Sequence, residues 1–130
     1  MVLTFVSAAR AFAALVRQIS SADWTGPGLG EWDLRSLVGH ASRSLITVST
    51  YLTTTTDSVD VTSPVEYYVK IRDYASTLGA ADILARGRQA GRDLGPDPAA
   101  TVDQLLRTVL DDLDGVDDPL IAVIGGLGIR

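Results

Sequence analysis

The 130-residue sequence contains no cysteine and only one histidine and one lysine. Without cysteine the chain has no means of forming disulfides, thiolate metal sites or a cysteine nucleophile. A formal net charge of −5 and scattered arginines disfavour nucleic-acid binding, because phosphate contacts need clustered cations. No apolar run is long enough to span a bilayer, so we expect no membrane insertion.

Low-complexity and repeated segments are also missing from the sequence. With 46% hydrophobic and 21% charged residues, the length suits one domain, 1–130, built around one core. The N-terminal segment has no basic region before its apolar residues, and Arg10 and Arg17 interrupt it at helical spacing. We therefore expect neither a signal peptide nor a spanning helix, and the cytoplasm is the expected location.

Helical periodicity dominates what is present. Apolar residues recur at three- and four-residue steps in five segments. The predicted helices span 3–21, 33–52, 80–94 and 98–114, with a shorter helix at 64–75. The expected apolar side of the helix at 80–94 comprises Ile83, Leu84, Ala90 and Leu94. We expect an all-α fold in which these helices form an antiparallel up-down bundle.

Capping residues mark the ends of these helices. Asp33 and Asp97 occupy predicted N-cap positions, and Ser63 with Glu66 predicts a capping box. The left-handed position that closes a helix suits Gly95, and the helix at 98–114 is expected to end at Gly115. Before the second helix, Trp24 and Trp32 bracket a turn-rich loop, where tryptophans either cover the end of a core or line the mouth of a pocket.

His40, the single histidine, falls within the predicted helix 33–52. At about 100° per residue it lies roughly 120° from the centre of that helix's apolar seam, at the flank of the buried stripe. It is either a boundary residue bonded to a carbonyl or water, or a functional group with partners elsewhere in the fold. Gly39 beside it weakens the helix, which is tolerable where a neighbouring helix or a ligand approaches closely.

The C-terminal third offers no independent motif. The acidic run at 111–118 lacks carboxylates at both ends of a calcium loop, so we interpret it as a solvated helix end. The segment GGLGIR at 125–130 lacks the surroundings of a dinucleotide fingerprint and is predicted to be a turn. The apolar LIAVI at 120–124 is expected to form a short strand or extended arm whose free edge pairs with a second copy.

The segment WDLRSLVGH at 32–40, which follows FAALVRQISSADW at 12–24, resembles the metal-binding N-terminal domain of the mycothiol-dependent maleylpyruvate isomerase family, within the DinB-like superfamily. Residues 83–100 and the GGLGIR segment are similar to the same family, so the resemblance covers most of the chain. It implies a four-helix, DinB-like bundle that holds a divalent metal, typically zinc, with three side chains. An open metal position then takes water or a thiol cosubstrate, for which mycothiol is the family's candidate.

The resemblance makes His40 the first metal ligand. Its other ligands, a glutamate and a second histidine, are expected shortly after the Gly-Gly segment, whereas this sequence stops at Arg130. The carboxylates that match no ligand position of the family are Glu31, Glu66, Asp82 and Asp103. We therefore expect a truncated member, a fragment, or a relative that has lost the metal.

Two hypotheses of function follow from the sequence. The first is the helical bundle of a metal-dependent, mycothiol-type transferase or isomerase, without a complete metal site in this chain. The second is a non-catalytic helical module for interaction or dimerisation. The expected partners are a small-molecule thiol for the first and a second copy of the chain, as a homodimer, for both.

Overall fold

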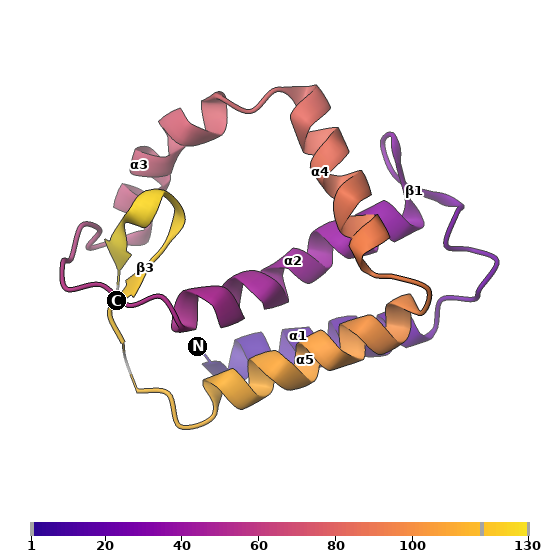
Figure 1. Ribbon diagram of the computed structural model, residues 1–130, viewed down its shortest axis with the longest axis horizontal. Helices are drawn as coiled ribbons and strands as arrows, with labels where there is room; N and C mark the ends of the chain where they lie inside the picture. Colours follow the sequence, from indigo (N-terminus) through magenta and orange to yellow (C-terminus); the bar gives the residue numbers. More distant parts are fainter. Residues whose placement is uncertain (1, 118, 130) are drawn as a thin grey trace.

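The computed structural model describes residues 2–117 and 119–129, which are mainly helical (Figure 1). The helices within this part are α1 (Val2–Arg17), α2 (Leu34–Leu52), α3 (Pro64–Ser76), α4 (Ala80–Asp93) and α5 (Pro98–Leu113). Short antiparallel pairs join β1 (Pro27–Leu29) to β2 (Trp32–Asp33), and β3 (Ile121–Ala122) to β4 (Gly128–Ile129). A 3-10 turn, η1 (Ile124–Gly126), separates the last two strands.

The predicted all-α class is confirmed, and the five predicted helices agree with the observed ones to within a few residues. The up-down order of a four-helix bundle stays a prediction. Of the helices that the structure describes, none is long and apolar enough to cross a membrane.

The hydrophobic core lies where α5 packs against both α1 and α2. Its buried side chains come from the apolar stripes of these three helices, and the fully enclosed ones are Ala13, Val102 and Val109. Trp24, in the loop after α1, is buried in the same core, which confirms that this tryptophan covers an end of the helices. Across the outside of α1 and α5, Arg17 donates two hydrogen bonds to Asp103, of 3.0 and 3.1 Å. This ion pair is exposed and therefore stabilises the fold only slightly.

Helix α4 crosses α2 near the start of α2 (Figure 1), and glycines form the contact. The buried residues of α4 are Gly87 and Gly91. A methyl group at Gly39 of α2 would overlap the backbone of α4, and one at Gly91 would lie 2.9 Å from the Cα atom of Ser36. The predicted apolar side of α4 is wrong at Ile83, which is 47% exposed. The reason is that close approach of the two backbones turns the glycine face, rather than the most apolar face, towards α2.

The predicted caps are largely confirmed. The carboxylate of Asp33 accepts a 2.8 Å hydrogen bond from the Ser36 amide, and that of Asp97 accepts one of 3.1 Å from the Ala100 amide. Both closing glycines have φ of +72°, Gly95 and Gly115. At α3 the capping box is only half correct, because the Glu66 carboxylate accepts from the Thr62 amide and not from the N-cap Ser63.

The C-terminal hairpin packs against the loop that follows α2. The predicted strand within LIAVI is confirmed as β3, but its predicted free edge is wrong. One edge of β3 pairs with β4, and on the other the Ala122 amide donates to the carbonyl of Thr54 at 2.7 Å. The segment predicted to be a turn carries η1 and β4 as well. Helix α3 contacts η1 and stands apart from α1 and α5 (Figure 1).

Candidate functional site

His40 lies on the surface of α2, more exposed than its predicted flank position implied. Its imidazole stacks on the indole of Trp32, with ring centroids 4.8 Å apart and ring planes inclined by 37°. Within the described residues no protein group forms a hydrogen bond with the imidazole nitrogens, so the carbonyl partner of the boundary interpretation is not found there. Both nitrogens therefore remain available to a ligand.

Trp32 is attached to α4 although it precedes α2. Its indole N–H donates a 3.0 Å hydrogen bond to the carbonyl oxygen of Leu84. The ring lies directly on Gly87, where a Cβ atom would overlap the indole. Sequence reasoning missed this contact. The spacing of Gly87 and Gly91, four residues apart on one helix face, was the signal that could have indicated it.

Arg35 makes a second connection between α2 and α4. Its guanidinium donates to the carbonyl oxygens of Gly91, at 3.3 Å, and Gly95, at 2.8 Å, and lies 5.9 Å from the ring centre of Trp24. The Gly91 carbonyl lies in the last turn of α4 and the Gly95 carbonyl just beyond the helix, so a cation there stabilises the negative end of the helix dipole. Trp32, Arg35 and Gly39 thus connect α2 and α4, whereas His40 is exposed.

Asp33 completes this segment as the N-cap of α2. Hydrogen bonding from Ser36 lowers the pKa of the Asp33 carboxyl below its ordinary value, and burial opposes this only in part. The carboxylate is therefore ionised at neutral pH, next to the positive end of the α2 dipole.

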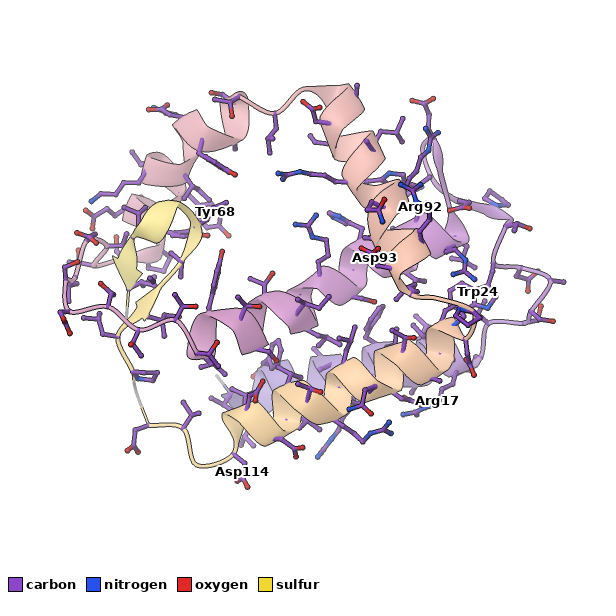
Figure 2. All side chains as sticks on the ribbon, viewed as in Figure 1. Arg17, Trp24, Tyr68, Arg92, Asp93 and Asp114 are labelled. Atoms are coloured by element: carbon purple, nitrogen blue, oxygen red, sulfur yellow. The ribbon has the colours of Figure 1, made fainter. Side chains whose placement is uncertain are left out.

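A cavity of about 390 Å³ opens between α2, α4 and α5, and its lining includes Gly39, the residue before His40, but not His40 itself. This volume is in the range of small-molecule sites. Its apolar lining comprises Ile46, Ala90, Leu94 and Leu105, and its charged lining comprises Arg43, Arg86 and Asp93. Figure 2 labels Asp93 where the end of α4 approaches α2. Asp93 accepts a 2.7 Å hydrogen bond from Gln89, whereas Arg43 and Arg86 have no ion pair or hydrogen bond with the described residues.

The described residues do not fit a metal site on their own. Across 2–117 and 119–129, no three His, Cys, Asp or Glu side chains lie close enough together to hold a metal ion. Three of the carboxylates that match no family ligand have other partners, since Glu66 binds Thr62, Asp82 binds the Gly79 amide and Asp103 binds Arg17. A single imidazole supplies only one of the three protein ligands that a catalytic zinc ion requires.

The family model described as the mycothiol maleylpyruvate isomerase N-terminal domain matches residues 5–123. The chain belongs to this family. The match confirms the resemblance found in the sequence, and it includes His40, Trp32 and the whole cavity lining. Neither the comparison with curated proteins nor the one with solved structures gave a match.

The donor set predicts weak metal binding by this chain. Titration of the 130-residue protein with zinc in a calorimeter should show no stoichiometric binding at submicromolar concentrations, because one neutral imidazole supplies one ligand. His40→Ala should remove only the weak contribution of this imidazole, with no loss of tight binding. Tight binding that disappears in His40→Ala would contradict this account and would require further ligands, for example from a second copy.

Proposed function

We propose that this chain is the helical domain of a thiol-dependent isomerase or transferase of the mycothiol type, and that the cavity between α2, α4 and α5 binds the thiol. The family match supports the reaction class. The observation that carries the proposal is the cavity itself, whose lining combines apolar side chains with a few polar and charged groups. A cytoplasmic location is part of the proposal.

The two arginines of the cavity can stabilise the ionised form of a bound thiol. Arg43 comes from α2 and Arg86 from α4, and neither charge is neutralised by a partner in the described part of the chain. Guanidinium groups next to a thiol favour its thiolate, which is the nucleophilic form. A bound thiol would therefore ionise more readily in the cavity than in water. The hydroxyls of Thr47, Thr50 and Tyr51 and the amide of Gln89 can hydrogen-bond to a polar thiol carrier such as mycothiol.

In this proposal His40 is the residue that would bind a metal ion. The family resemblance makes this imidazole one ligand of a divalent ion, but the described residues contain no group of three possible metal ligands. The remaining ligands would then come from residues that are not part of this sequence. The thiol-binding role of the cavity does not depend on that metal.

We predict that mycothiol binds in the cavity and that Arg86→Ala weakens the binding about tenfold, since a hydrogen bond to a charged group contributes roughly 1.5–3 kcal/mol net and about 1.4 kcal/mol is a tenfold change in Kd. The measurement is a calorimetric or NMR titration of the full chain. Arg88→Ala is the matched control, because Arg88 is an exposed arginine of the same helix that does not line the cavity.

A second ligand separates thiolate recognition from general affinity. S-methylated mycothiol has no ionisable thiol, so Arg86→Ala should weaken its binding much less than that of mycothiol. The proposal is wrong if mycothiol does not bind, or if Arg86→Ala and Arg88→Ala weaken binding equally.

The exposed face of α3 favours a second candidate, a module for self-association. No residue of α3, all of which the structure describes, is buried. Val65 is 74% exposed, Tyr68 69% and Val69 53%, and their spacing places them on one side of the helix. A two-fold pairing of α3 would cover this side in both copies at once. This surface replaces the β3 edge as the route to a homodimer.

For this second candidate we predict a dimer that depends on α3. Sedimentation equilibrium at high micromolar concentration should show a dimer for the wild-type chain and a larger monomer fraction for Tyr68→Glu. Leu15→Glu, at a 63% exposed position of α1, is the control and should behave like the wild type. A wild-type chain that is monomeric under these conditions would refute the dimer.

A further inference from the structure

We propose that Trp32 is a positioning residue that fixes the orientation of the His40 imidazole. The inference rests on the proposed function, in which His40 is the functional group beside the cavity. It goes beyond that function because it assigns a role to a tryptophan outside the cavity lining.

The indole of Trp32 restricts the rotation of the His40 side chain. With 4.8 Å between the ring centroids and 37° between the planes, the indole covers one face of the imidazole. His40 is otherwise exposed, so its side chain would rotate freely without this contact. An aromatic pair of this kind favours the stacked orientation roughly two- to tenfold. One imidazole face and the ring edge that carries the nitrogens are left for a ligand.

Helix α4 holds the indole of Trp32 in place. The indole does not depend on His40 for its own position, because the N–H bond to Leu84 and the surface of Gly87 hold it from α4. A side chain larger than hydrogen at Gly87 would displace the ring. The orientation of His40 on α2 is therefore set by α4, the helix that also supplies Arg86 to the cavity. Through Trp32, α4 as well as α2 determines where the imidazole nitrogens point.

The comparison with Trp24 separates positioning from packing. Trp24 is 8% exposed and belongs to the hydrophobic core, where its ring contacts Arg35 and not His40. Trp32 is only half-buried, and its ring lies between a glycine and an exposed histidine. Replacing either tryptophan removes buried apolar surface, but only Trp32 covers the imidazole.

Proton NMR of the full chain, without thiol or metal, tests this role. Because the sequence has one histidine, the imidazole Hε1 and Hδ2 signals belong to His40 without further assignment. In the wild type these signals should be displaced from their positions in the unfolded chain by the indole ring current, with nuclear Overhauser contacts to the Trp32 ring. Trp32→Leu should return them to the unfolded-chain positions. Trp32→Phe, which keeps a ring and loses the N–H donor, should reduce the displacement.

Trp24→Phe is the control and should leave the His40 signals in place, although it perturbs the core. The proposal is overturned if Trp32→Leu leaves the signals unchanged, or if Trp24→Phe moves them as far as Trp32→Leu does. If circular dichroism shows that Trp32→Leu is unfolded, Trp32→Phe decides alone, and an unchanged displacement then overturns the proposal. Because no thiol is present, a failure here leaves the cavity proposal intact, and a failure of thiol binding leaves the stacking intact.

Discussion

The close contact between the backbones of α2 and α4 is the constraint on which the site depends. Gly39 and Gly91 let the backbones of the two helices approach without an intervening side chain, and Gly87 leaves room for the indole of Trp32. That approach gives the indole of Trp32 a flat surface and brings the end of α4 within reach of Arg35. It also defines two walls of the cavity. A tight helix crossing, rather than a large apolar interface, thus determines the geometry around His40.

The segment 32–40, which carries the resemblance to the family, consists largely of residues that hold this helix contact in place. Four of its residues stabilise the fold. Trp32 and Arg35 donate hydrogen bonds to carbonyls of α4 and of the loop that follows it, Asp33 caps α2, and Gly39 allows the close contact with α4. A resemblance carried by such residues indicates a shared way of packing helices, and a shared reaction is a separate inference. The residues of the segment that bear on the proposed function are His40 and Gly39, which lines the cavity.

Local signals in the sequence were sufficient for the helices and insufficient for their contacts. Periodicity and capping residues located all five helices, because both act within a few residues of chain. The face of α4 was misjudged at Ile83, since hydrophobicity does not reveal that a backbone will lie against the glycines. The edge of β3 was misjudged because its partner, the Thr54 region, lies far away in the sequence. His40 could be singled out from the sequence because it is the single histidine. Its stacking on Trp32, and the presence of Arg43 and Arg86 in the lining of one cavity, exist only in the folded chain.

The unfolding free energy of Gly39→Ala, measured by urea denaturation, tests the helix contact most directly, because two effects of opposite sign compete at this residue. Alanine favours a helix over glycine by about 1 kcal/mol, so a position free of contacts would become more stable. At Gly39 the added methyl group meets the backbone of Ala90 and Gly91, which cannot rotate away as a side chain would. We predict a net loss of about 1–3 kcal/mol, with Ser44→Ala on the exposed side of α2 as the neutral control. A Gly39→Ala protein as stable as the wild type, or more stable, would contradict the close contact and the site built on it.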